Sequence, residues 1–514
     1  MANTTKRRSR RSALKKKRDN LPILNFKFRQ LRNPLPPTEF LNEEKLEQIH
    51  DASMRILEEI GIDFFDDEAL SLWESVGAKV DHKNRHVWIE RGLLLDLIAK
   101  APASFNFLAR NPKHNLFVGE NSHCFMPMGG MVYASDMDRG RRPGVLADVI
   151  ETFKVLQMCN MVHMVGGGPE MHDVDPTLRH LENTWISYTL SDKVVYGSSH
   201  GRIITQDTVE MAKIVFGDPL PDDPVIYGVV NVNSPLRYDD RMLGGMITLA
   251  RAGQFSIITP FILAGAMSPI TIASAIAQQN AEALAGIALT QIVNPGAPVV
   301  YGGFTTNIDM KTGSPAFGTP EGAWATYIGA QLARKYRLPY RGSGSLCSAN
   351  YPDATAAYET MWSMWPTLMA HTNMVNHSAG WIENGLTMSY EKFIMDIESL
   401  AMFYHLFEGF EISDETLALD MMAHVGPGGH HLGTPHTQAR YENEFFMPHM
   451  RSGQSFENWQ KAGAEEAPLR ANRIWKTLLK NYEQPELDTA VADALADFIA
   501  RRKRELEGVD LYTD

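Results

Sequence analysis

The chain has few cysteines, no long apolar run and none of several common catalytic motifs, and each of these absences excludes a class of protein. Cysteine is scarce, with three among 514 residues (Cys124, Cys159 and Cys347), and their spacing matches neither a disulfide framework nor a metal site. No run of eighteen apolar residues occurs, so we expect no membrane-spanning helix. Phosphate-loop, nucleophile-elbow, zinc-protease and CxxC patterns are also missing. We therefore predict a cytoplasmic protein that binds no membrane and no metal.

Charge is distributed unevenly along the chain. Residues 1–18 carry nine Lys or Arg and no acid, which leaves −21 for the rest of a chain whose formal net charge is −12. The basic segment suits a disordered, solvated tail or a contact with nucleic acid or anionic lipid, and composition favours the tail over residues 1–20. The acidic body argues against a nucleic-acid-binding protein.

A strand-then-helix pattern recurs eight times between residues 121 and 410. The expected strands cover 124–134, 161–166, 193–199, 224–231, 255–262, 298–304, 339–345 and 374–380. The expected helices cover 144–159, 176–190, 204–216, 237–252, 269–293, 320–336, 353–371 and 390–408. Eight such units predict an α/β fold, a (β/α)8 TIM barrel. An open doubly wound sheet is the alternative, but no strand leads into a GxGxxG turn.

Helical additions flank the predicted barrel. Residues 21–120 are expected to form a mixed α/β region, with a helix over Thr38–Ile60 and Thr38 as its N-cap. Residues 411–514 are predicted to be helical, interrupted by the glycine-rich segment Gly426–His436. The C-terminal region would cap the barrel or serve a homo-oligomer. His430, His431 and His436 in this segment lack a carboxylate or thiolate partner, so we predict no zinc there.

The carboxyl ends of the expected strands are rich in aromatic side chains and poor in acids. Active sites of barrel enzymes lie on the loops that follow the strands. Aromatic faces attract quaternary ammonium groups, whereas a scarcity of paired carboxylates speaks against a glycosidase. For any single ring, packing in the core is the competing interpretation. His200 and His377 also lie at strand ends, where one of them is expected to orient a ligand.

Four long segments resemble the trimethylamine methyltransferase family. They are YGGFTTNIDMKTGSPAFGTPE (301–321), RGSGSLCSANYPDATAAYE (341–359), NMVNHSAGWIENGLTMSYEKFIMDIE (373–398) and GPGGHHLGTPHT (426–437). The resemblance spans roughly residues 40–480. It implies a (β/α)8 barrel that moves a methyl group from a methylamine to the cob(I)alamin of a separate corrinoid protein. The cobalamin (corrinoid) would then be carried by the partner, with no cofactor held tightly by this chain.

One departure from the family bears on the substrate. The trimethylamine-specific branch carries pyrrolysine around the segment that corresponds to Ser345–Asp353, which here is SLCSANYPD with standard residues only. The chain is similar to the pyrrolysine-free branch, in which glycine betaine and related quaternary amines are substrates. A quaternary ammonium already leaves as a neutral tertiary amine, so no general acid is required. The enzyme's tasks are then positioning and exclusion of water.

These observations together predict methyl transfer from glycine betaine, which would leave dimethylglycine. Carnitine, proline betaine, a sulfonium or trimethylamine are alternative methyl donors, and a barrel that binds quaternary amines without turnover is a rival of another class. The predicted cation cage consists of Tyr227, Tyr301, Phe304, Tyr351 and Trp381. Ser345, Asn376 and His377 are predicted to hold the carboxylate, and Glu383 to face the ammonium or to pair with an arginine.

Overall fold

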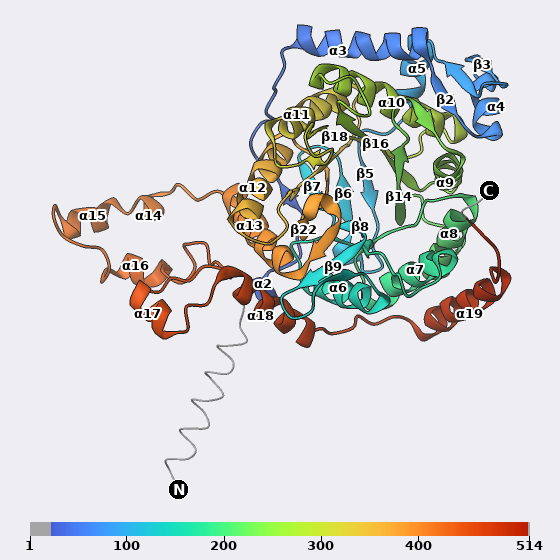
Figure 1. The fold of residues 1–514 in the computed structure, drawn as a ribbon. Coiled ribbons are helices and arrows are strands. Elements are labelled where there is room, and N and C mark those ends of the chain that lie inside the picture. Colours follow the sequence, from blue (N-terminus) through green and yellow to red (C-terminus); the bar gives the residue numbers. More distant parts are fainter. Residues whose placement is uncertain (1–21, 512–514) are drawn as a thin grey trace.

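Eight parallel strands and the helices that follow them dominate the computed structural model, which describes residues 22–511 (Figure 1). The strands are β7 (Ser122–Phe125), β11 (Met164–Val165), β13 (Val194–Tyr196), β14 (Ile226–Val232), β16 (Phe255–Ala264), β17 (Val299–Gly302), β20 (Tyr340–Ser343) and β21 (Met374–Asn376). The helices are α6 (Leu146–Met158), α7 (Arg179–Leu190), α8 (Arg202–Phe216), α9 (Asp240–Arg251), α10 (Ile272–Val293), α11 (Pro320–Lys335), α12 (Ala354–Met369) and α13 (Tyr390–Glu408). The predicted order of strands and helices is therefore confirmed, whereas the predicted basic tail lies outside the described residues.

Strands that follow one another along the chain are also neighbours in the sheet. The order is β11–β13–β14–β16–β17–β20–β21–β7, and each of these pairs is parallel. The two end strands of this order approach each other, because His163 N donates to Phe125 O at 3.0 Å. Their continuations, β8 (Gly129–Met131) and β12 (Gly168–Pro169), pair in parallel. The chain is thus an α/β protein built on a parallel sheet.

The sequence explains why these strands are central. Nearly every residue of β16 is buried, and a parallel sheet covered by helices requires such continuous apolar runs. Helix α10 is buried along most of its 22 residues. It lies between the sheet and the N-terminal helices α3 (Glu43–Arg55) and α5 (Arg91–Ile98) (Figure 1), so it has no polar face.

The N-terminal region packs around the sheet. Helix α3 begins after Asn42, whose side chain accepts from Lys45 N, so the predicted N-cap at Thr38 is wrong by four residues. The other elements are α2 (Pro22–Asn25), β1 (Leu31–Arg32), the π-helical turn η1 (Ile56–Ile60), β2 (Ile62–Phe64), α4 (Asp67–Ser75), β3 (Lys79–Asp81), β4 (His86–Trp88), β5 (Phe105–Phe107) and β6 (Leu116–Val118). Strands β2, β3 and β4 form a small sheet with β15 (Arg237–Tyr238).

The hairpin β5–β6 closes the amino ends of the parallel strands. Phe105 and Phe107 pack against Phe255, the first residue of β16, with ring centroids 4.9 and 5.0 Å apart. The same apolar cluster contains Val194 and Met374, which begin β13 and β21. The hairpin therefore covers the amino ends of these strands in the described structure.

The remaining elements surround the opposite end and the outside. Strands β9 (Tyr133–Asp136), β10 (Gly140–Pro143), β22 (Trp381–Ile382) and β23 (Thr387–Ser389) form a four-stranded sheet, and β18 (Phe304–Ile308) with β19 (Pro315–Ala316) extends the main one. The C-terminal helices are α14 (Asp414–Leu417), α15 (Leu419–Val425), α16 (Pro435–Arg440), α17 (Phe456–Lys461), α18 (Ala467–Lys480) and α19 (Thr489–Glu505). Helices α18 and α19 pack on the body, whereas α14, α15 and α16 project from it (Figure 1). Among residues 22–511, no helix has the length and apolar character to cross a membrane.

Candidate active site

A cavity of about 740 Å³ lies at the carboxyl ends of the parallel strands. This volume falls within the range of roughly 300–1,000 Å³ that small-molecule sites occupy. Its walls come from the ends of β13, β14, β16, β20 and β21 and from the loops after β7 and β11. Five of the nine predicted site residues line it, namely Tyr227, Phe304, Asn376, His377 and Trp381.

A continuous aromatic wall forms one side of the cavity. The ring centroid of Phe304 lies 5.0 Å from Phe261, 5.3 Å from His377 and 6.2 Å from Trp381, and the rings of His377 and Trp381 are 4.2 Å apart. The Trp381 indole N–H is buried and has no hydrogen-bond partner among the described residues. An unpaired buried donor beside ring faces is suited to a polar or ionic ligand.

A second pair of rings lies on neighbouring strands. Tyr196 and Tyr227 meet edge to face at 5.2 Å, and both line the cavity. Tyr227 also packs against Phe107 of the closing hairpin, so its ring forms the floor of the chamber. Ring faces on two sides allow the cavity to surround a cation without a carboxylate.

A buried arginine, Arg341, lies between these rings. Its side chain is 2% exposed, lines the cavity and holds its guanidinium carbon 5.1 Å from the Phe304 ring centroid. Nη1 donates to Gly303 O at 3.2 Å. In the amide orientation that satisfies both groups, the Asn376 side-chain oxygen accepts from Nη2 at 3.0 Å and from Nε at 3.2 Å. The predicted site residue Asn376 is therefore a hydrogen-bond partner of Arg341.

Arg341 has no anionic partner within the described part of the chain. Burial lowers the pKa of its guanidinium to about 10, while Tyr340 and Tyr227 raise it, so the group remains charged at neutral pH. A buried charge without a counter-ion is costly, and protein interiors normally avoid it. The guanidinium fork has five donors, three of which are used here, so it can still bind a carboxylate.

His377 occupies a strained backbone position after β21. Its φ of +52° is in the left-handed region, which residues other than glycine rarely adopt and which clusters at functional sites. Burial, followed by the charge of Arg341, holds the pKa of His377 well below its usual value, so the ring is neutral. Its Nδ1 lies 3.2 Å from Ser343 Oγ. A neutral imidazole beside Arg341 can accept or donate a hydrogen bond but adds no charge.

Buried charges on α13 hold the loop that carries these residues. Asp396 accepts from Gly380 N at 2.8 Å and forms an ion pair with Lys392, and both side chains are buried. Gly380 has a φ of +90° and Met128 lies where a side chain would project, so glycine is required there. The ion pair on α13 thereby fixes the path of the chain between His377 and Trp381.

Four predicted site residues lie outside the cavity. Tyr301 points away from it into the layer between the sheet and α10, where its hydroxyl donates to Asn280 Oδ1 at 3.0 Å. Ser345 is buried and donates to Ser378 O at 2.6 Å. Tyr351 is half exposed on the loop before α12. Glu383 accepts from Arg141 Nε at 2.8 Å, so of its two predicted roles the structure shows the pairing with an arginine. The structure does not place these four against a ligand in the cavity.

Carboxylates are scarce in the cavity. Among the described lining residues, Glu170 is the only carboxylate, and it accepts from Arg179 Nη1 at 2.9 Å. His200 lines the cavity too, but burial lowers its pKa, so it is neutral. This arrangement supports binding and positioning of a charged molecule more than acid–base chemistry.

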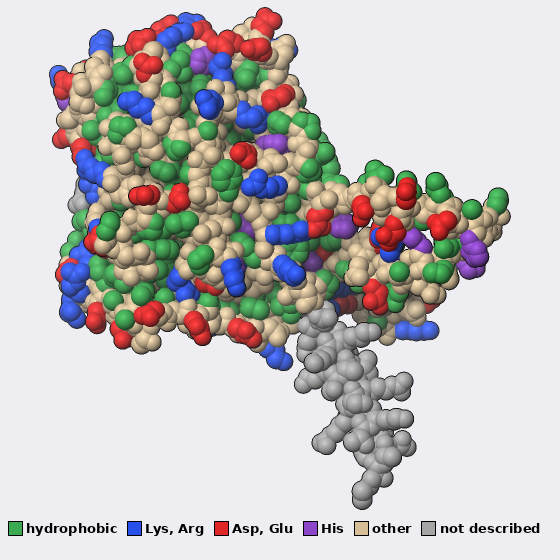
Figure 2. All heavy atoms as spheres, turned by 180° about the vertical axis from the view of Figure 1, so that it is seen from behind, with side chains coloured by type: hydrophobic (Ala, Val, Ile, Leu, Met, Phe, Trp, Pro, Cys, Tyr) green, Lys and Arg blue, Asp and Glu red, His purple; other side chains and the backbone are tan. Residues whose placement is uncertain are grey.

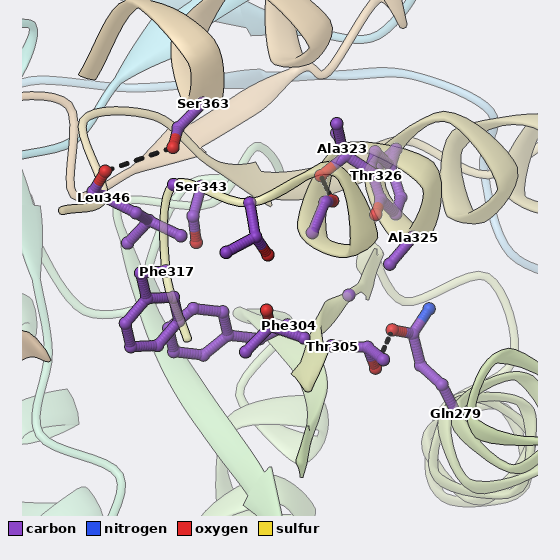
Figure 3. A pocket seen from close by; sticks show the side chains of 16 residues that line it. Gln279, Phe304, Thr305, Phe317, Ala323, Ala325, Thr326, Ser343, Leu346 and Ser363 are labelled. Carbon is purple, nitrogen blue, oxygen red and sulfur yellow. Dashed lines mark hydrogen bonds between the residues drawn. The ribbon is translucent and has the colours of Figure 1, made fainter. Parts of the chain in front are cut away.

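A smaller pocket of about 30 Å³ adjoins the cavity behind Phe304 (Figure 3). Figure 3 shows the rings of Phe304 and Phe317 side by side at one end and Gln279, which accepts from Thr305 Oγ1, at the other. This volume holds about one or two water molecules, so it is too small for a substrate. We therefore place the site in the larger cavity.

Sequence reasoning missed Arg341, Phe261 and Tyr196 as site residues. Arg341 gave a signal, since a charged side chain in the middle of a buried parallel strand (PYRGSGS) requires a partner or a ligand. Phe261 lies at a predicted strand end but, like Tyr196, was not distinguished from a core ring, because rings on strands buried on both faces occur equally in cores.

A parallel α/β fold with a ring-lined, cationic cavity at the ends of its strands is typical of an enzyme that acts on a small charged molecule. Comparison with protein families agrees and is more specific. The chain belongs to the trimethylamine methyltransferase (MTTB) family, whose model matches residues 5–507. It is therefore a methyltransferase.

Several known proteins are similar to this chain. A glycine betaine methyltransferase of Desulfitobacterium hafniense (strain Y51) is 38% identical over 475 residues, 92% of this chain and 98% of the relative. The trimethylamine methyltransferase MttB of D. hafniense (strain DSM 10664 / DCB-2) is 29% identical over 90% and 94% of the two chains. A crystal structure of a hydroxylamine complex of MtmB has a TM-score of 0.50 at 12% identity, covering 87% of this chain and 90% of that one. This last likeness supports the α/β fold.

Proposed function

We propose that this enzyme transfers a methyl group from glycine betaine to the corrinoid of a partner protein, leaving dimethylglycine. The observation that carries the proposal is Arg341, a buried cation that faces a ring-lined cavity and has no counter-ion among residues 22–511. Glycine betaine has a carboxylate for the guanidinium and a quaternary ammonium for the rings. The similarity to a relative named for this activity points the same way.

Trimethylamine fits the same cavity less well. As a protonated amine it would bring a second cation next to Arg341 and leave the guanidinium without a partner. As the neutral amine it would instead need a proton donor near the leaving nitrogen, and the cavity's one described carboxylate is engaged by Arg179. Carnitine and proline betaine retain both a carboxylate and a quaternary ammonium, so they are the closest alternatives.

The proposed reaction needs little from the protein beyond geometry. The methyl carbon leaves the ammonium nitrogen, the electron pair of the C–N bond stays on nitrogen, and the product is a neutral tertiary amine. The corrinoid, when its carrier is docked, supplies the nucleophile that accepts the methyl group. Arg341 and Asn376 would hold the carboxylate, while Phe304, Trp381 and Tyr227 would surround the ammonium and exclude water. No general acid is required.

We also propose that the parallel sheet is a closed (β/α)8 barrel. The hydrogen bond from His163 N to Phe125 O and the parallel pair β8–β12 support closure between β7 and β11. The hairpin β5–β6 would then plug the amino end, and the corrinoid carrier would approach the carboxyl end. A cytoplasmic location is supported by three buried, unpaired cysteines, which suit a reducing compartment.

A methyl-transfer assay tests the proposal. The purified enzyme is mixed with reduced free cobalamin as the acceptor and with glycine betaine, carnitine, proline betaine or trimethylamine, and the amine product is identified by mass spectrometry. Dimethylglycine from glycine betaine is the expected product. If trimethylamine alone were turned over, the proposal that glycine betaine is the methyl donor would be wrong. Tight binding of betaine with no methyl transfer would favour a non-catalytic binding protein.

A further inference from the structure

An arm of residues 409–441 leaves the body without a core of its own. It contains α14, α15 and α16 and projects beside α12 and α13 (Figure 1). Figure 2 shows it as a narrow extension with hydrophobic, acidic and histidine side chains on its surface. In the described structure, Ala418 and Thr434 are the buried residues of the arm.

Large apolar side chains of the arm face solvent. Six of them are between 56% and 86% exposed, namely Phe410, Ile412, Leu419, Met422, Leu432 and Tyr441. In the described chain, the hydrogen bonds and ion pairs of the arm, such as Arg440–Glu415, stay within residues 406–444. A short segment of a monomer seldom exposes so many large apolar side chains, because such side chains are normally covered by a partner.

A second uncovered apolar surface lies next to the base of the arm. Tyr358, Trp362 and Trp365 are spaced four and three residues apart on one face of α12, and Met402 and Leu406 lie on the adjacent helix α13. All five side chains are 45–61% exposed. We call this surface the ledge. The arm extends away from α12 and α13 (Figure 1), and the side chains of both surfaces are exposed, so both are left uncovered in one copy.

We propose that the arm of one copy packs on the ledge of a second copy, and that the reciprocal contact forms a homodimer. Counting roughly 100 Å² for each of these half-exposed large side chains, one arm on one ledge buries about 1,000 Å², and the reciprocal pair about 2,000 Å². A stable interface needs about 1,200–2,000 Å², so the two contacts together suffice.

A second copy fits the surface better than the corrinoid carrier does. A carrier that must leave after each methyl transfer would expose the arm again in every cycle, whereas permanent apolar surfaces require a permanent partner. Arm against arm is unfavourable, because each arm carries Glu411, Asp414, Glu415 and Asp420 against the single Arg440. The ledge is uncharged and apolar, and a two-fold axis satisfies both contacts at once.

Sedimentation of the full chain at micromolar concentration tests the interface. The wild type should sediment as a dimer of the 57.5 kDa chain, and Leu419→Glu in the arm or Trp362→Glu on the ledge should each give monomers. Ile60→Glu, at an equally exposed apolar position on the N-terminal region, should leave the dimer intact. Circular dichroism establishes that each variant is folded.

Mixing the two variants distinguishes a swapped contact from general loss of solubility. Leu419→Glu and Trp362→Glu chains together retain one intact arm and one intact ledge, so a fraction of dimer should return. A mixture of Leu432→Cys and Tyr358→Cys chains should also form cross-linked dimers with a flexible bismaleimide, since the three native cysteines are buried. A monomeric wild type, or a dimer that both glutamate substitutions leave unchanged, would overturn the proposal.

Discussion

Replacing Arg341 by methionine should distinguish the contribution of the substrate's carboxylate to binding from that of its ammonium group. The change removes the positive charge of the guanidinium. It also removes the N–H donors that the hydrogen bonds to Gly303 and Asn376 leave free to bind a carboxylate, and it keeps most of the side-chain volume. Hydrogen bonds to charged groups contribute about 1.5–3 kcal/mol, and breaking a buried charge pair costs about 2–5 kcal/mol. We therefore expect the affinity for glycine betaine to fall by about 3 kcal/mol, which is roughly 100-fold.

The same change should barely affect a cation that has no carboxylate. Tetramethylammonium offers the aromatic wall its positive charge but gives Arg341 nothing to bind, and loss of a nearby positive charge would, if anything, strengthen its binding. Arg341→Lys keeps the charge but not the planar fork, so it should weaken betaine binding less than Arg341→Met does.

Calorimetric titration of each variant with both ligands measures these effects. Arg141→Met is the matched control, because Arg141 is paired with Glu383 outside the cavity. That variant should bind betaine like the wild type. The role given to Arg341 would be refuted if Arg341→Met bound betaine normally, or if its affinities for betaine and for tetramethylammonium fell by the same factor.

Three other predictions concern the rings and the buried charges. Trp381→Leu should weaken quaternary ammonium binding by about 1–2 kcal/mol. The Tyr301 side chain faces Asn280, so Tyr301→Leu should lower stability and leave binding intact. Ligand titration measures the binding and thermal unfolding the stability of each variant, and equal binding losses in the two variants would contradict the structure. Burial lowers the pKa of His123 to about 4, that of His163 to about 3 and that of His377 well below 6.5. Below pH 6.5 the unfolded chain therefore binds more protons than the folded chain. The free energy of unfolding, measured by urea titration, should fall by up to ~1.4 kcal/mol per pH unit for each histidine as the pH drops from 6.5 toward 4, and it should stay level above pH 7. A decline above pH 7 without one below pH 6.5 would contradict this prediction. Asp396→Ala leaves Lys392 buried without its partner and should cost about 3–5 kcal/mol of stability, most of which Lys392→Met with Asp396→Leu should restore; a single variant as stable as the wild type would show that the pair does not matter.

The strand and helix order was accessible from the sequence, because each buried strand is a short apolar run followed by a periodic helix. Val299–Gly302 and Tyr340–Ser343 fall within their predicted ranges. The first predicted strand, 124–134, is split at Pro127 into β7 and β8, because proline has no N–H to donate to a neighbouring strand.

Which face of a strand a ring occupies was not accessible. Both faces of a parallel sheet are buried, so the apolar pattern does not distinguish the interior from the helix-covered outside. Tyr301 and Phe304 are three residues apart and were both predicted to line the site, yet Tyr301 faces α10 and Phe304 the cavity. Tyr351 was assigned from its place after a strand, but its loop extends into solvent.

The arm illustrates a different limit of sequence reasoning. Helical periodicity over residues 411–514 predicts helices but does not say what they pack against. Helices α18 and α19 lie on the body, and α14, α15 and α16 do not. This difference depends on distant surfaces such as the ledge, which a local pattern does not encode.

A crystal structure of the enzyme with glycine betaine tests the central claim most directly. The carboxylate should lie within hydrogen-bonding distance of the Arg341 guanidinium, and the trimethylammonium group should lie against the rings of Phe304 and Trp381. A carboxylate bound elsewhere, with Arg341 still facing an empty or water-filled space, would contradict it.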